Sequence, residues 1–205
     1  QYVLGHTEFY GRTFKVDPAV LIPRPETELL CRDAIKLGMR VYRMRSPYGK
    51  NAEPVRILDL CTGSGCIAWT MALSIPGSRV TAVDISDAAL EVASGQDFAS
   101  ELKSKETFRP EFIKADVLDS EQEIELGPFD MVLSNPPYIM ESEKEDMRRN
   151  VLEYEPESAL FVPDDDPLLF YRAIARWNRL PGIGMSRLPA RLKRSSRLPV
   201  MPIRR

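Results

Sequence analysis

Apolar and polar positions alternate in short blocks along most of this chain. Four apolar runs have the length of strands and end at turn or acidic residues, and they occupy residues 55–60, 79–85, 111–117 and 129–134. The intervening pattern predicts helices at about residues 66–74 and 88–99, the second capped by Ser86 or Asp87. Strands that alternate with helices predict an α/β fold with a mostly parallel sheet wound by helices.

The same pattern divides the chain into segments. Residues 1–50 are predicted to contain a hairpin within residues 1–17, a helix at about residues 26–39 and a linker around residues 43–51. Residues 51–177 hold the alternating strands and helices, and they form the predicted core domain.

Acidic residues stand at the carboxyl ends of the first three predicted strands. Asp59 ends the first strand, Asp84 follows 25 residues later at the end of the second, and Asp116 ends the third. The carboxyl ends of parallel strands border the crevice where open α/β sheets bind ligands. Each carboxylate alone is also compatible with a solvated strand end, but three at successive strands predict a pocket.

The turn after the first strand is Cys61-Thr62-Gly63-Ser64-Gly65, and its D-x-C-x-G-x-G pattern differs from the G-x-G-x-x-G of dinucleotide-binding folds. Its glycines allow a ligand close to the backbone, and unpaired N–H groups at the next helix start point above the turn. Asp59 suits a ligand with an amino group and would repel a pyrophosphate. Asp84 suits the two hydroxyls of a ribose, and Asp116 with Val117 suits the amine and ring of an adenine.

An amino acid, a ribose and an adenine together make S-adenosylmethionine, which is the cofactor that the sequence predicts. The predicted cofactor-binding residues are Asp59, Cys61, Thr62, Gly63, Ser64, Gly65, Asp84, Ile85, Asp116, Val117 and Asn135. No metal is required for this chemistry. The three cysteines form no CxxC pair, and together with the single histidine they indicate neither a zinc site nor a disulfide framework.

The fourth predicted strand is followed by the hook, Asn135-Pro136-Pro137-Tyr138, whose four residues are the predicted catalytic residues. The Asn side-chain carbonyl and the backbone carbonyl of the first Pro can both accept hydrogen bonds from one NH2 group. Two prolines fix φ near about −65° and keep the loop from relaxing. Tyr138 is expected to pack against the group that is held, so the hook predicts a grip on a flat amide or amine.

Several stretches resemble the HemK/PrmC-type protein-(glutamine-N5) methyltransferases of peptide-chain release factors. The resemblance covers residues 1 to about 175, and besides the hook it is carried by Tyr2-Val3-Leu4-Gly5, Glu8-Phe9-Tyr10-Gly11, Leu21-Ile22-Pro23-Arg24-Pro25-Glu26-Thr27-Glu28 and Glu153-Tyr154-Glu155-Pro156-Glu157-Ser158-Ala159-Leu160. It implies a Rossmann-like class I S-adenosylmethionine-dependent methyltransferase fold, in which the fourth of seven strands lies between the first and fifth. It also implies methyl transfer to the side-chain amide of a Gln in the Gly-Gly-Gln loop of a release factor.

Two other interpretations stay open. A nucleic-acid adenine or cytosine amino-methyltransferase can use the same hook after base flipping. The Arg24-Pro25-Glu26-Thr27-Glu28 element and the lack of a target-recognition region count against it. The other alternative is a non-catalytic remnant that binds the cofactor weakly or not at all.

The chain also departs from the family near the cofactor and at its start. Cys61 stands at the first glycine of the family's turn, and we expect it to cost little because its φ can stay negative. Val117 stands where an aromatic residue is often found. The chain begins at Gln1, so we expect the family's small helical N-terminal domain, which helps to hold the release factor, to be missing.

The C-terminal part departs most. A helix is expected to begin at residues 171–177, where the resemblance stops before the family's fifth strand and final hairpin. Residues 172–205 contain ten basic residues and no acidic residue. Residues 178–205 are interpreted as a disordered or aberrant tail from another reading frame or an unspliced segment, with a basic RNA-binding tail as the alternative. Without a fifth strand, the apolar side chains of the fourth are expected to face water, which would make the chain marginal or inactive.

Composition places the chain among ordinary globular domains. It has 205 residues, of which 43% are hydrophobic and 28% charged, and a formal net charge of −2, which allows one sizeable core. Acidic clusters at residues 119–125 and 141–146 are interpreted as solvated helix faces. No apolar run reaches the roughly 18 residues of a membrane span. A cytoplasmic or mitochondrial protein that is not secreted is expected, and nucleic acid is expected to bind only through the basic tail.

Overall fold

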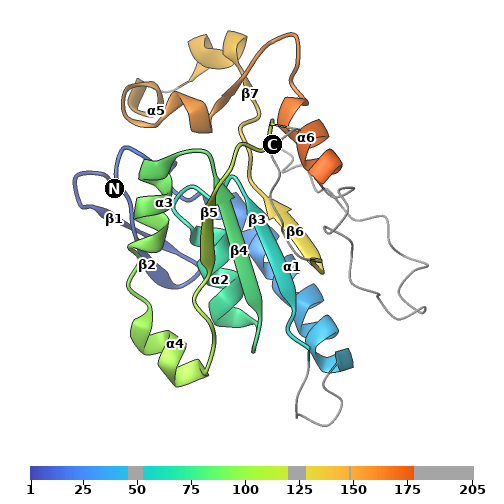
Figure 1. Cartoon of the computed structure of the whole chain (residues 1–205). Coiled ribbons are helices and arrows are strands. Elements are labelled where there is room, and N and C mark those ends of the chain that lie inside the picture. The colour runs from blue at the N-terminus through green and yellow to red at the C-terminus, as the bar shows by residue number, and fades with distance from the viewer. Residues whose placement is uncertain (46–52, 120–127, 148, 178–205) are drawn as a thin grey trace.

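A four-stranded parallel sheet forms the centre of the protein in a computed structural model (Figure 1). The structure describes residues 1–45, 53–119, 128–147 and 149–177. The strand order is β5-β4-β3-β6, formed by Glu111–Lys114, Arg79–Asp84, Arg56–Leu60 and Met131–Ser134. This order confirms the predicted parallel sheet and places the fourth predicted strand directly beside the first.

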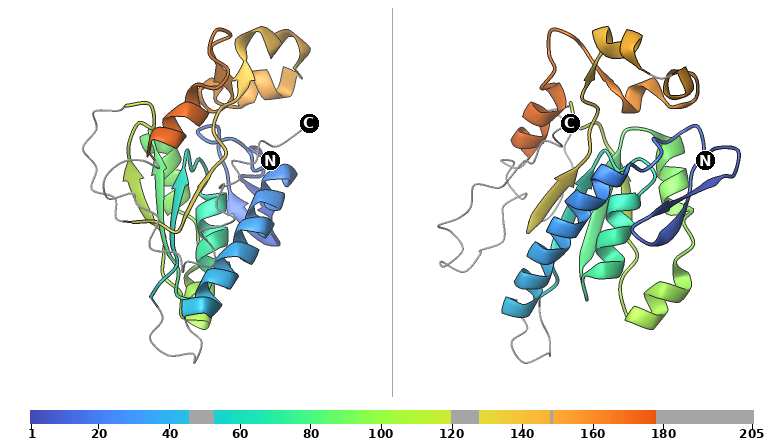
Figure 2. Two further views of the ribbon diagram at one scale, coloured as in Figure 1. Left: turned by 90° about the vertical axis from the view of Figure 1, so that its right-hand side faces the viewer. Right: turned by 180° about the vertical axis from the view of Figure 1, so that it is seen from behind.

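The side chains of β3 point alternately into two hydrophobic layers, as the period of a strand requires. Ile57 packs in a core cluster with residues of α1 (Pro25–Arg45) and α2 (Cys66–Ser74), whereas Leu58 and Leu60 pack with α6 (Leu169–Trp177). Figure 2 shows α1 and α2 together on one face of the sheet. Burial on both faces explains why β3, after its exposed first residue Arg56, is apolar except for Asp59.

Helix α1 ends at Arg45 rather than near residue 39, which corrects the predicted end of this helix and the predicted start of the linker at residue 43. Its last residue has a structural role. The Arg45 guanidinium donates to both carboxylate oxygens of the fully buried Asp130 at 2.7 and 2.5 Å, and Asp130 also accepts the backbone N–H of Arg56 at 2.9 Å. The pair therefore fixes the end of α1 to the starts of β3 and β6, while the rest of the predicted linker lies outside the described residues.

The predicted helix at residues 88–99 is two helices, α3 (Asp87–Ser94) and α4 (Ala99–Lys105), so that prediction was wrong in its extent. Gly95 ends α3, and its N–H still donates to the Glu91 carbonyl at 2.8 Å. The next side chain, Gln96, accepts the Lys15 N–H at 2.8 Å and donates to the Ser64 carbonyl at 3.1 Å. Because Gln96 is buried to make these hydrogen bonds, α3 does not continue through this residue.

The predicted N-terminal hairpin is confirmed as β1 (His6–Phe9) and β2 (Arg12–Lys15). Phe14 from β2 is fully buried, and its ring lies 5.0 Å from that of Phe98, which in turn lies 5.2 Å from Trp69 of α2. This aromatic row fixes the hairpin against the helical layer.

A cap segment, residues 139–162, follows the hook. It consists of β7 (Ile139–Met140), the 3₁₀ helix η1 (Glu141–Asp146), α5 (Arg149–Tyr154), the 3₁₀ helix η2 (Glu157–Ala159) and β8 (Phe161–Val162). Strands β7 and β8 pair in parallel with each other. Figure 1 shows the cap segment beyond the carboxyl ends of the central strands.

Strand β6 is an outer strand of the sheet within the described residues, but its side chains are covered. Met131 and Leu133 are 3% and 8% exposed, and Val132 packs against the cluster that holds Ala173 and Trp177 of α6. The expectation that these apolar side chains would face water was therefore wrong, because α1, α2 and α6 cover them. None of the helices in the described parts is both long and apolar enough to cross a bilayer.

Candidate active site

The turn after β3 is built from residues with positive φ. Cys61, Gly63 and Gly65 have φ of 58°, 53° and 78°. The Thr62 N–H donates to the Val83 carbonyl at 3.0 Å, and the Gly65 N–H donates to the Thr62 carbonyl at 2.9 Å, which closes the turn. The expectation of a negative φ at Cys61 was wrong, because this tight path from strand to helix needs the left-handed conformation. The side chain at Cys61 therefore adds strain that glycine would avoid.

Asp59 lies next to this turn and lines neither of the two cavities described below. Its carboxylate is fully buried, accepts the Thr62 hydroxyl at 2.6 Å and accepts the Ala68 N–H at 3.1 Å, both through Oδ2. Oδ1 has no hydrogen-bond partner among the described residues. Burial raises the pKa of Asp59 to about 7, although the Thr62 and Ala68 hydrogen bonds oppose this rise. Asp59 therefore supports the turn through Oδ2, and its expected contact with a ligand stays a prediction.

Asp84 joins the turn to the second strand end. Its Oδ2 accepts the Gly63 N–H at 2.8 Å, and its Oδ1 accepts the Ser86 N–H at 3.0 Å. Ser86 in turn caps α3 by accepting the Ala89 N–H at 3.2 Å, which selects Ser86 over Asp87 as the cap. Each carboxylate oxygen can accept more than one hydrogen bond, so Asp84 retains acceptor capacity toward a ligand.

The residues after β5 form another wall. The Asp116 side chain accepts the Leu118 N–H at 2.8 Å, and Val117 is 5% exposed. The Trp177 indole N–H donates to the Val117 carbonyl at 2.9 Å. Helix α6 therefore fixes the position of Val117, a contact that links the far end of the described chain to the predicted adenine wall.

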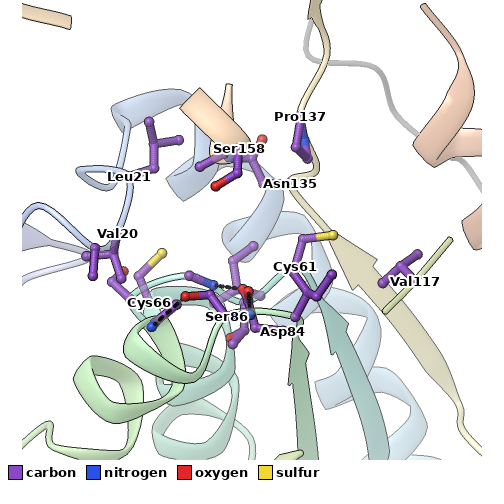
Figure 3. Close-up of a pocket in the computed structure, with 18 of the residues that line it drawn as sticks. Val20, Leu21, Cys61, Cys66, Asp84, Ser86, Val117, Asn135, Pro137 and Ser158 are labelled. Carbon is purple, nitrogen blue, oxygen red and sulfur yellow. Dashed lines mark hydrogen bonds between the residues drawn. The ribbon is translucent and has the colours of Figure 1, made fainter. Parts of the chain in front are cut away.

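A first cavity lies over these strand ends (Figure 3). The predicted cofactor residues that line it are Cys61, Thr62, Gly63, Ser64, Asp84, Ile85, Asp116, Val117 and Asn135. Asp59 and Gly65 do not line it. In Figure 3, Asp84 and Ser86 lie on one side of the cavity, and Leu21, Ser158 and Asn135 lie opposite them.

The hook lies between this cavity and a second one. Asn135 and Pro137 line the first cavity, whereas Asn135, Pro136 and Tyr138 line the second. Tyr138 is 47% exposed, and the N–H groups of Tyr138 and Ile139 both donate to the Leu160 carbonyl, at 3.3 and 3.0 Å. A group held by Asn135 would therefore lie where the two cavities meet.

Sequence reasoning missed the N-terminal contribution to this site. Ala19, Val20, Leu21, Pro23 and Thr27 line the first cavity, together with Ser158 and Ala159 of the cap segment and Phe170 of α6. The second cavity is lined by Leu21, Arg24, Glu26, Thr27, Asn135, Pro136, Tyr138, Ile139, Met147, Val151, Ala159 and Leu160. The sequence signal for these residues was the family resemblance of residues 21–28, which periodicity alone does not connect to the strand ends. No group of His, Cys, Asp and Glu in the described residues is arranged to hold a metal.

Comparison with known proteins gives matches over most of the chain. Residues 48–156 match the family described as the methyltransferase small domain. A release factor glutamine methyltransferase of Bacteroides thetaiotaomicron is 44% identical over 179 residues, which cover 87% of this chain and 57% of that protein. A protein of the same name from Flavobacterium psychrophilum is 42% identical over 174 residues, covering 85% of this chain and 55% of that one. The chain thus spans about half the length of these relatives.

A solved structure shows the same fold. The catalytic domain of hMettl16, in complex with the MAT2A 3′UTR hairpin 6, superimposes with a TM-score of 0.53 and 14% sequence identity. The match covers 81% of this chain and 56% of that one. At this identity the likeness concerns the fold alone, and it agrees with the Rossmann-like class I arrangement expected from the sequence.

The strain at Cys61 predicts an unusual order of stability. We expect Cys61→Gly to be more stable than Cys61→Ala by about 1 kcal/mol, because both remove the thiol but only glycine removes the left-handed penalty. In the interior of α2, Ala72→Gly should instead destabilise by about 1 kcal/mol. Urea unfolding of the three variants measures both differences. If Cys61→Ala is as stable as Cys61→Gly, backbone strain at this position is contradicted.

Burial of Asp59 predicts a pH-dependent stability. The unfolded carboxyl has a pKa of about 3.9, so between about pH 4 and 7 the native state holds a proton that the unfolded state lacks. The stabilisation that comes from this proton is complete below about pH 4 and is lost as the pH rises through about 7. Asp59→Asn should therefore gain stability relative to the wild type from pH 5 to 8, by on the order of 2–4 kcal/mol. If urea unfolding gives the same difference in stability between Asp59→Asn and the wild type at every pH, the raised pKa of Asp59 is contradicted.

Proposed function

The chain belongs to the methyltransferase small domain family, and on that premise we propose that it transfers a methyl group from S-adenosylmethionine to the side-chain amide of a glutamine in a peptide-chain release factor. The names of relatives at 42–44% identity support the acceptor. The observation that carries the proposal is the position of Asn135, which lines both cavities at once. The activity is a proposal because the chain matches only part of the length of those relatives.

The residues that line the first cavity support its assignment as the cofactor site. A Cβ built on Gly63 would meet nothing within 4 Å, so the backbone of the turn is open to a ligand. Asp84 would hold the ribose hydroxyls and Asp116 the adenine amine, with Ile85 and Val117 against the ring. Bound in this way, the cofactor supplies an electrophilic sulfonium methyl group.

The second cavity would hold the acceptor amide. An amide nitrogen is a poor nucleophile because its lone pair is delocalised into the carbonyl. Asn135 Oδ1 and the Pro136 carbonyl would accept both amide hydrogens and leave the nitrogen facing the first cavity. The same oxygens would stabilise the positive charge that develops on nitrogen, so they act more strongly in the transition state than in the ground state.

The remaining hook residues would position the amide. Pro136 and Pro137 restrict the backbone on each side of the accepting carbonyl. The half-exposed ring of Tyr138 lines the second cavity and would pack against the flat amide.

A nucleobase amine would fit the same two acceptors, so the acceptor class must be tested. The negative charge beside the second cavity favours a protein acceptor over a nucleic acid. Helix η1 (Glu141–Asp146) has four carboxylates and one lysine, and the flanking residues Ile139 and Met147 line the second cavity. Carboxylates at this position would repel a phosphate backbone.

Cofactor binding is tested at Asp84. Asp84→Ala should weaken binding of S-adenosylmethionine in calorimetry by about 1–3 kcal/mol, because the ribose hydroxyls lose a charged acceptor. Asp87→Ala is the matched control, since Asp87 is 76% exposed and does not line the cavity. Equal affinities in the two variants would remove Asp84 from the site.

Methyl transfer is tested at Asn135. Asn135→Ala should lower the transfer rate about 10²–10³-fold, the typical loss for one transition-state hydrogen-bonding group, with little change in cofactor affinity. Mass spectrometry follows the glutamine of the Gly-Gly-Gln loop, with a release factor lacking that glutamine as the control. DNA and RNA are included in the same reaction. Methylated adenine or cytosine beside an unmodified release factor would overturn the proposed acceptor.

A further inference from the structure

Two stretches that stand out in the sequence, residues 21–28 and 153–160, meet in the structure through one ion pair. Nη2 of Arg24 lies 2.8 and 2.6 Å from Oε1 and Oε2 of Glu155, although the two residues are 131 positions apart. The pair joins the segment before α1 to the cap segment. Nothing in the proposed methyl transfer itself requires these two charges.

The carboxylate is buried, whereas the guanidinium is not. The Glu155 side chain is 4% exposed and that of Arg24 is 35% exposed. Burial of Tyr2, and after it the nearby Glu155 carboxylate, raises the pKa of Tyr2 to about 12. A buried carboxylate depends on its cation, so removing Arg24 would leave a charge that this region cannot solvate.

Residues beside both members of the pair contribute to the walls of the two cavities. On the Arg24 side, Leu21 and Thr27 line both cavities. On the Glu155 side, Ala159 does the same. Figure 3 shows Leu21 and Ser158, one from each segment, on the same side of the first cavity across from Asp84.

The Glu155 segment also holds the hook. Within it the Ala159 N–H donates to the Pro156 carbonyl at 3.0 Å, which makes a short rigid turn. This turn ends at Leu160, whose carbonyl accepts the N–H groups of Tyr138 and Ile139. A continuous path of contacts therefore runs from Arg24 through Glu155 and Leu160 to the backbone of the hook.

We propose that Arg24 and Glu155 are positioning residues for the acceptor. Their ion pair holds the cap segment so that Leu160 fixes the hook and the second cavity keeps its shape. The proposed cofactor contacts lie mainly at the strand ends, whereas Arg24 lines the second cavity and not the first, so the pair should affect the acceptor more than the cofactor. The inference rests on the proposed function for the identity of the acceptor, but not for the role of the pair in holding the hook.

The first test measures the hook directly by amide hydrogen exchange. Arg24→Ala should speed exchange at Tyr138 and Ile139 tenfold or more. Glu101→Gln is the matched control, because Arg12 and Glu101 form a similar pair at 2.6 Å, with side chains 13% and 27% exposed, between the hairpin and α4. Unchanged exchange at the hook in Arg24→Ala would overturn the proposal whatever the enzyme methylates.

The second test is kinetic and uses Glu155→Gln, Arg24→Lys and Glu101→Gln. Glu155→Gln should raise the KM for the release factor at least tenfold while the Kd for S-adenosylmethionine changes less than threefold. Arg24→Lys should keep a KM for the release factor close to that of the wild type. One nitrogen of Arg24 makes both contacts with Glu155, and the lysine ammonium can take its place.

The outcomes separate the two proposals. An equal rise in KM for Glu101→Gln, or a larger effect on cofactor binding than on KM, would show a general loss of structure and overturn the positioning role. Wild-type protein that leaves the release factor unmodified would overturn the proposed function, and the exchange experiment would still decide whether the pair holds the hook. If Glu155→Gln melts below the assay temperature, Arg24→Lys carries the comparison, and a full loss of activity in that folded variant would count against the proposal.

Discussion

The parallel pairing of β3 with β4 on one side and β6 on the other is the constraint on which the rest of the structure depends. It brings the ends of three strands to one edge of the sheet, so that the turn at Cys61, the carboxylate of Asp84 and the amide of Asn135 all face one space. Hydrogen bonds across the strand ends maintain this arrangement, from Thr62 N–H to the Val83 carbonyl and from the Ser134 hydroxyl to the Leu60 carbonyl. The cofactor pocket and the hook are therefore consequences of one strand order.

The sheet provides one wall of the site, and distant segments provide the other. The segment before α1 and the cap segment contribute no strand to the central sheet, yet both line the two cavities. Single polar contacts hold these segments in place, such as Arg24 with Glu155 and the Tyr2 hydroxyl with the Val20 carbonyl at 2.6 Å. Such contacts join residues far apart in the chain, so they can shape an acceptor site independently of the cofactor site.

The parts that could be predicted from sequence are those governed by local pattern. Apolar runs gave the four strands, and the parallel sheet followed from their alternation with helices. The predictions failed where a contact distant in sequence decides the conformation. Gln96 bonds to Lys15 and Ser64 and so cannot extend α3, and Arg45 is held in α1 by Asp130. Cys61 has a positive φ because the turn is short, which its residue type alone would not indicate.

In the proposed mechanism, Asn135 presents an amide from the second cavity to a cofactor in the first. A crystal structure with S-adenosylhomocysteine and a peptide containing Gly-Gly-Gln tests it most directly. We expect the adenosyl group beside Asp84 and Asp116, with the glutamine side-chain nitrogen within hydrogen-bond distance of Asn135 Oδ1 and the Pro136 carbonyl. A glutamine side chain bound outside the second cavity, or an adenosyl group away from the strand ends, would contradict it.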